Sequence, residues 1–222
     1  MNAYYNVLQI RRDKYGDNHI DVASALNSIG LALFKLELYE YALHSFNESL
    51  RIRRQLLGPD HRDVSVVLYN VATINLETGN DDEALANYRE VLRIERIVLG
   101  PNHSDVALTM QHIAHVHQQR GELDDALHYF TESLAIQRKQ QRNDKSQKNN
   151  EKSAKHYAAI AETLDHIGNV HLQRAQTKDI IDAFSESTRC LRVSGKCDDD
   201  LRVSGLNFYG ISKMYLECPA AV

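Results

Sequence analysis

Histidine and aspartate recur together at three places in the chain, and side chains of these two types can act as an acid–base pair. They stand in the tetrapeptides Gly16-Asp17-Asn18-His19, Gly58-Pro59-Asp60-His61 and Gly100-Pro101-Asn102-His103, followed by Asp21, Asp63 and Asp105. A residue that recurs with the same linker is more often structural than catalytic. The sequence has no nucleophile with its base, no phosphate-binding loop and no paired acidic motif. It therefore predicts a protein that is not an enzyme, with no catalytic residues and no cofactor.

Three further histidines, His112, His115 and His117, gather on one predicted helix. His112 and His115 are three residues apart, a spacing that allows both to bind one metal ion. No cysteine or carboxylate is obviously placed with them, and a metal site needs three or four converging ligands. We therefore predict no metal site and interpret the histidines as solvated. A metal protein or enzyme that uses this helix is the less favoured alternative.

Composition narrows the class of protein further. The 222 residues carry a net charge of -4, so the chain as a whole lacks the basic surface typical of nucleic-acid binding. The three cysteines are an odd number without short spacing, which favours a reducing compartment over a disulfide framework. No apolar run approaches the length of a membrane span, and the first residues show no signal peptide. We predict a cytoplasmic protein that binds neither nucleic acid nor membranes.

The tetrapeptides recur at a fixed step of 42 residues, and other residue types follow the same step. Small and aromatic residues repeat in the series Ala42, Ala84 and Ala126 and in the series Tyr4, Phe46, Tyr88 and Phe130. A period between 20 and 50 residues is typical of stacked arrays, in which each unit buries its apolar face against its neighbours. Such arrays present long surfaces to other macromolecules.

Each period divides into two helical stretches. In the first copy, apolar residues recur at helical spacing around Leu26 and again around Phe46. Gly79 and Gly121 mark the turn between paired helices, where glycine accepts a left-handed backbone. Asp21 and its two repeats lie at or just before the next helix start, where a carboxylate can accept backbone N–H groups and interact with the helix dipole.

The register breaks after residue 137. Residues 138–156 are polar and basic with almost no apolar residue, so we interpret them as a flexible insert, with a helical extension as the alternative. The pattern then resumes about 12 residues late. The predicted organisation is a half repeat at 1–20 (second helix only), repeats at 21–62, 63–104 and 105–137, the insert at 138–156, a divergent repeat at 157–197 and a further first helix at 198–222.

The repeated motif resembles the tetratricopeptide repeat. An apolar residue, two spacers, an apolar residue and a small residue precede an Ala-x3-aromatic pair: Leu26-x2-Ile29-Gly30 with Ala42-x3-Phe46, Leu68-x2-Val71-Ala72 with Ala84-x3-Tyr88, Met110-x2-Ile113-Ala114 with Ala126-x3-Phe130, and Leu164-x2-Ile167-Gly168 with Ile180-x3-Phe184. The small residues that end the first-helix motif let the paired helices approach: Gly30, Ala72, Ala114 and Gly168. The fourth copy departs, with Ile180 for alanine, Ala175 for the turn glycine and Thr188 for a leucine, which leaves its tight packing an open question.

The 42-residue step with its Leu-Gly-Pro linker is most similar to the kinesin light chain-like subgroup. The resemblance implies an all-α, right-handed solenoid of paired antiparallel helices, about four and a half repeats long, whose concave groove binds a peptide of a partner protein. It places ten groove residues one and five positions after the first apolar residue of each motif: Asn27, Leu31, Tyr69, Thr73, Gln111, His115, Asp165, Asn169, Asn207 and Ile211. The predicted function is an adaptor or scaffold, with cargo adaptation as its sharpest form. The alternative is a self-associating scaffold in which the half repeats at the two ends pair.

Overall fold

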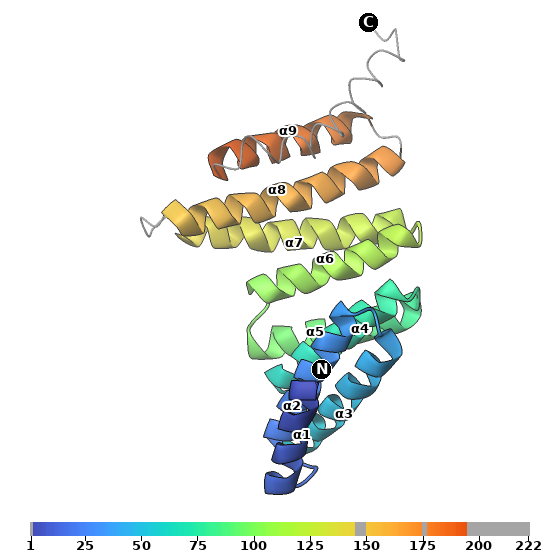
Figure 1. Ribbon diagram of the computed structural model, residues 1–222. Helices are drawn as coiled ribbons and strands as arrows, with labels where there is room; N and C mark the ends of the chain where they lie inside the picture. Colours follow the sequence, from blue (N-terminus) through green and yellow to red (C-terminus); the bar gives the residue numbers. More distant parts are fainter. Residues whose placement is uncertain (1, 145–149, 175–176, 195–222) are drawn as a thin grey trace, which may run out of the picture. The chain divides into compact units, whose positions relative to one another are not determined.

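The computed structural model describes residues 2–144, 150–174 and 177–194, which form nine α-helices and no strand (Figure 1). The helices are α1 (Asn2–Tyr15), α2 (Ile20–Lys35), α3 (Tyr39–Leu57), α4 (Arg62–Glu77), α5 (Asp81–Val98), α6 (Ser104–Gln119), α7 (Leu123–Asp144), α8 (Asn150–Gln173) and α9 (Thr177–Ser194). The all-α prediction is confirmed. None of these helices is long and apolar enough to cross a bilayer. The predicted helix at 198–222, with Asn207 and Ile211, lies outside the described residues.

The chain divides into two compact units, residues 1–116 and 117–222. In the first unit α2 packs against α3 and α4 against α5, as the two-helix pattern predicts. In the second unit α8 packs against both α7 and α9. The predicted repeat starts at 21, 63 and 105 each fall one residue after the first residue of a helix.

Histidine, rather than aspartate, caps the first helices. The Nδ1 atom of His19 accepts a hydrogen bond from the backbone N–H of Asp21 at 3.2 Å, and His61 does the same for Asp63 at 3.1 Å. The aspartate stands inside the first helical turn, where its charge interacts with the helix dipole but its side chain is not the cap. The recurring histidines therefore have a structural role at the helix starts.

Close contact between a glycine and a phenylalanine ring holds the first helix pair together. A Cβ atom on Gly30 of α2 would lie 2.7–2.8 Å from three ring atoms of Phe46 on α3. The buried Ser49 hydroxyl donates to the Ala23 carbonyl at 2.7 Å, which ties the same two helices by a second contact. The sequence prediction that a small residue permits close approach describes this geometry.

The fourth copy keeps the same packing. Gly168 of α8 lies 138 residues after Gly30, and a Cβ atom there would lie 2.7–3.0 Å from the ring of Phe184. The Ser187 hydroxyl donates to the Ala161 carbonyl at 3.1 Å, in the same register as Ser49 and Ala23. Although isoleucine replaces alanine at position 180, its side chain is buried. The substitution at position 180 therefore leaves the packing of α8 against α9 tight, whereas Ala175 lies outside the described residues.

One position on the second helices connects each pair to the next first helix. In the first unit, Arg11 donates to the Asp21 carbonyl at 2.8 Å and Arg53 pairs with Asp63 at 2.6 Å. The residue 42 positions later is Glu95, which accepts from the Thr109 hydroxyl at 2.7 Å. Within the second unit the same column holds Gln137, which accepts from Thr163 at 2.9 Å. The residue type at this position changes along the chain, but its contact with the next first helix is kept.

The segment predicted as an insert is helical on both flanks. Helix α7 continues to Asp144 and α8 begins at Asn150, so residues 138–144 and 150–156 are helical. Lysine, arginine and glutamine, which fill much of α7 beyond residue 137, are good helix formers, and this explains the extension. The helical alternative describes these flanks better than an unstructured insert does.

Candidate functional site

The predicted groove residues lie on the first helices of the repeats, and four of them are accessible on α2 and α4. Asn27 and Leu31 stand one turn apart on α2, and Tyr69 and Thr73 occupy the same register on α4. With His115 of α6 they form what we call the first-helix surface. Leu31 is 40% exposed and the other four are half-buried. The surface thus combines one apolar side chain with amide, hydroxyl and imidazole groups.

A pair of amides joins α2 to α4 on this surface. The Asn70 Nδ2 group donates to Asn27 Oδ1 at 3.4 Å. The carbonyl side of the Asn27 amide is therefore engaged, while its NH2 group supplies two further donors. Asn27 can donate to a peptide carbonyl without giving up its contact with Asn70.

An aromatic and polar cluster joins α4, α5 and α6. Tyr69 Oη lies 2.5 Å from His112 Nε2, and the His112 ring stacks on Tyr88 with a centroid distance of 5.3 Å. The Thr73 hydroxyl donates to the Tyr69 carbonyl at 3.0 Å and lies 3.1 Å from Tyr88 Oη. These contacts fix the orientation of the Tyr69 and Thr73 side chains, so this part of the surface is pre-organised.

Burial sets the protonation state of this cluster. Burial, and to a smaller extent the nearby His115, lowers the pKa of His112 to about 4. Burial also raises the pKa of Tyr88 to about 12 and raises the pKa of Tyr69. Around neutral pH the imidazole and both phenols are therefore uncharged, and the cluster offers neutral hydrogen-bonding groups rather than a charge.

The two remaining predicted groove residues of the first unit differ in their exposure to solvent. Gln111 is only 8% exposed, which leaves its amide little access to a ligand, whereas His115 is half-buried. Asn70 and His112 each stand one position after a predicted groove residue and were not among the predicted groove residues. The 42-residue step, which places Asn70 and His112 in one column, was the signal that could have identified them.

In the second unit, Asp165 and Asn169 are half-buried on α8. Burial raises the pKa of the Asp165 carboxyl, and the nearby Ser187 hydroxyl partly opposes this shift. The neighbouring His166 stacks on Phe130 with a centroid distance of 5.3 Å, and burial lowers its pKa. This stack repeats the register of His112 on Tyr88, so a half-buried neutral histidine against the preceding aromatic is a recurrent feature.

The three-histidine helix does not provide a common site. His112 bonds to Tyr69, whereas His117, which is 4% exposed, has its Nδ1 2.5 Å from the Glu122 carboxylate. Among the described residues, the one group with metal-ligand spacing is His117, Glu122 and Asp125, without the other two histidines. Arg120 also pairs with Glu122 at 3.0 Å. The pKa of Glu122 is lowered mainly by its hydrogen bond with His117 and, to a smaller extent, by the charge of Arg120. This arrangement closes the turn after α6.

Comparison with known proteins identifies a matching family and several solved structures with a similar fold. A family model described as tetratricopeptide repeat matches residues 21–97 and 66–139. No curated protein sequence matches the chain. The fold is similar to that of BtubC (BKLC) from P. vanneervenii, with a TM-score of 0.67 and 16% identity over 88% of this chain and 70% of that one.

Two further solved structures share the fold. The putative kinesin light chain TPR-like repeats of Podosopora anserina match with a TM-score of 0.52 and 15% identity over 80% of this chain and 89% of that one. The apo form of RapI matches with a TM-score of 0.66 and 14% identity over 85% of this chain and 63% of that one. At these identities the likeness concerns the fold alone.

Proposed function

Since the chain belongs to the tetratricopeptide repeat family, we propose that it is a non-catalytic module that binds a peptide segment of a partner protein on its first-helix surface. Repeats of this family generally bind proteins or peptides. The observation that carries the proposal is the accessible row of Asn27, Leu31, Tyr69 and Thr73 on neighbouring first helices. A cytoplasmic location and an adaptor role belong to the same proposal.

The chemistry of this surface suits an extended peptide. Asn27 and Thr73 supply hydrogen-bonding groups that can pair with backbone amides regardless of peptide sequence. Leu31 offers an apolar contact for a side chain. The five residues of the surface include no lysine or arginine, so we expect weak binding to peptides that depend on a terminal carboxylate. The cargo-adaptor form of the proposal is supported only by the resemblance of the 42-residue motif to kinesin light chain-like repeats.

A random peptide library displayed on phage tests the proposal. Peptides selected on the wild-type chain are measured by isothermal titration calorimetry against Leu31→Ala and Asn27→Ala. We expect each variant to weaken binding about tenfold, since each removes a contact in the middle of the surface. Ile97→Ala is the matched control, because Ile97 is an exposed apolar residue on the second helix α5. Equal affinity for wild type and both surface variants would argue against this surface as the binding site.

A second candidate function, self-association, is favoured by the apolar residues of α1. Tyr4 is 46% and Ile10 is 65% exposed, whereas Phe46 and Ile52, which lie 42 residues later, are fully buried. A helix resembling α2 would cover this face if a second copy supplied it. Light scattering coupled to size-exclusion chromatography, at two protein concentrations, tests this candidate. A single mass equal to that of the monomer at both concentrations would exclude it.

A further inference from the structure

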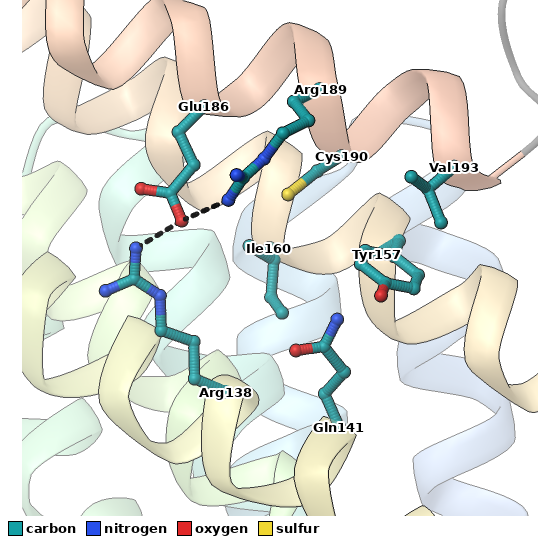
Figure 2. Close-up of a pocket in the computed structure, with 8 residues that line it drawn as sticks. All are labelled: Arg138, Gln141, Tyr157, Ile160, Glu186, Arg189, Cys190 and Val193. Atoms are coloured by element: carbon teal, nitrogen blue, oxygen red, sulfur yellow. Dashed lines mark hydrogen bonds and ion pairs between the residues drawn. The ribbon is translucent and has the colours of Figure 1, made fainter. Parts of the chain in front are cut away.

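A cavity of about 310 Å³ lies in the second unit, between the ends of α7, α8 and α9 (Figure 2). Its size is at the lower end of the range for small-molecule sites. The residues that matter for its chemistry are Arg138, Gln141, Ile160, Glu186, Arg189 and Cys190. Figure 2 shows the Gln141 amide pointing toward Ile160, with the charged groups of Arg138, Glu186 and Arg189 gathered at one side. None of these residues belongs to the first-helix surface.

The first cause of the cavity is a smaller side chain in the core. Cys190 stands in the register position that isoleucine holds in the other copies, as Ile52, Ile94 and Ile136. These three isoleucines are buried, and so is Cys190, which therefore fills less of the same space. Burial raises the pKa of the Cys190 thiol, so the thiol is neutral at neutral pH. Together with Ile160 it forms an apolar wall.

The second cause is the replacement of the linker by helix. Helix α2 begins at Ile20, and the equivalent position 138 residues later is 158, but α8 already begins at Asn150. In the first unit the linker carries an oxygen ligand for an arginine: Arg51 donates to Asn18 at 2.8 Å, and Arg93 pairs with Asp60. Arg189 is in register with these two arginines, and a helical histidine, His156, stands in the register position of Asn18.

The charges beside the cavity are not balanced. Glu186 lies 2.5 Å from the Arg138 guanidinium, and the same carboxylate lies 3.9 Å from Arg189, which is too long for a hydrogen bond. One carboxylate thus faces two guanidinium groups, and the polar side of the cavity carries one positive charge in excess. Arg189 lacks the oxygen ligand that Arg51 and Arg93 have, and it lies next to an apolar wall. It is therefore suited to a ligand that carries an anionic oxygen and an apolar group.

We propose that this cavity binds a carboxylate on a short apolar stem. The carboxylate takes the place beside Arg189 that Asp60 has beside Arg93, and the stem packs against Ile160 and Cys190. The Gln141 amide donates a further hydrogen bond. The carboxylate belongs either to a small molecule or to an acidic side chain of a bound peptide, and the chemistry of recognition is the same in both.

Titration of the 222-residue chain with isovalerate, followed by two-dimensional 15N–1H NMR, tests the proposal. We expect saturable shifts at Ile160 and Cys190 and at least about tenfold weaker binding of isovaleramide, which has the same shape without the charge. Arg189→Gln should weaken isovalerate binding about tenfold, because it removes the charged donor. Arg51→Gln is the matched control in the first unit and should leave binding unchanged. Equal binding of acid and amide, or no effect of Arg189→Gln, overturns the proposal.

A cavity-filling variant adds an independent readout. Cys190→Ile restores the side chain of the other copies and should abolish the shifts. If this variant fails to fold, Arg189→Gln carries the test, since the Arg189 side chain is 78% exposed and its replacement leaves the core intact. The blocked tripeptide acetyl-Ala-Glu-Ala-amide separates the two sources. Binding of the tripeptide alone assigns the cavity to an acidic side chain of a partner, binding of isovalerate supports a small molecule, and binding of neither overturns the proposal.

Discussion

Replacement of Gly30 by alanine tests whether the contact between α2 and α3 is as close as the structure describes. Alanine is a better helix former than glycine by about 1 kcal/mol, so propensity alone predicts a more stable protein. In the structure, however, the new methyl group would meet three ring atoms of Phe46 at 2.7–2.8 Å. Carbon atoms prefer separations of about 3.5–4.0 Å, so the ring or the helix must move by most of an ångström.

The Phe46 ring has no room for such a movement. It is 1% exposed and fully surrounded, so the strain passes to the backbones of α2 and α3. Overpacking of this kind costs about 1–3 kcal/mol. Subtraction of the propensity gain leaves an expected net loss of up to about 2 kcal/mol in the free energy of unfolding, measured by urea unfolding with far-ultraviolet circular dichroism.

A double-mutant cycle separates the two effects. Phe46→Leu shortens the side chain and leaves space for the methyl group of Gly30→Ala. In that background we expect the alanine to be neutral or stabilising by up to about 1 kcal/mol, because only its helix propensity remains. If Gly30→Ala stabilises the wild-type chain, or if its effect is the same with leucine at position 46, the close contact does not exist and the assigned helix register is wrong.

Three further predictions concern the stability of the first unit. The pKa of His112 is about 4 in the folded chain and 6.5 ordinarily, so between these pH values the unfolded chain binds one proton more than the folded chain. The contribution of His112 to stability is therefore complete above pH 6.5 and is lost as the pH falls toward 4. The free energy of unfolding from urea titrations should decline by about 2 kcal/mol from pH 7 to pH 5 in wild type, and this part of the decline should be absent in His112→Asn. Glu37, with a φ of 59°, stands where Gly79 has a φ of 75°, so Glu37→Gly should raise the midpoint of thermal unfolding by relieving about 1 kcal/mol of backbone strain, and Gly79→Ala should lower it. Ser49→Ala should lose about 0.5–1.5 kcal/mol in urea unfolding, because the hydrogen bond from the Ser49 hydroxyl to the Ala23 carbonyl, which joins α3 to α2, is removed; an unchanged midpoint would contradict that bond.

Much of the helical architecture could be predicted from sequence, for a physical reason. Each hairpin needs a small residue opposite an aromatic, as at Gly30 and Phe46, and this pair recurs at a fixed separation. Apolar spacing then predicts both helices of the pair, and the repeated step predicts the next pair. The fourth copy follows the rule despite its substitutions, because Gly168 and Phe184 keep the contact that sets helix separation.

The details of the surface could not be predicted in the same way. Whether Gln111 is exposed depends on how far α6 is rotated about its axis, and a rotation of one residue moves a side chain by about 100°. Gln111 is buried for this reason, while Asn70 and His112 reach neighbouring elements. Likewise, aspartate and histidine are both able to accept the backbone N–H at a helix start, and only the backbone geometry shows that His19 does so.

The cavity proposed as a binding site in the fourth copy is compatible with unchanged helix packing. The contact of Gly168 with Phe184 fixes the distance between α8 and α9 in the C-terminal half of α8, away from the start of that helix. The change from isoleucine to Cys190 and the early start of α8 are both located toward one end, where the other copies have their linker. Substitutions there open space beside Arg189 while the core contacts remain. A site formed in this way is independent of the first-helix surface, so each can be removed by mutation without loss of the other.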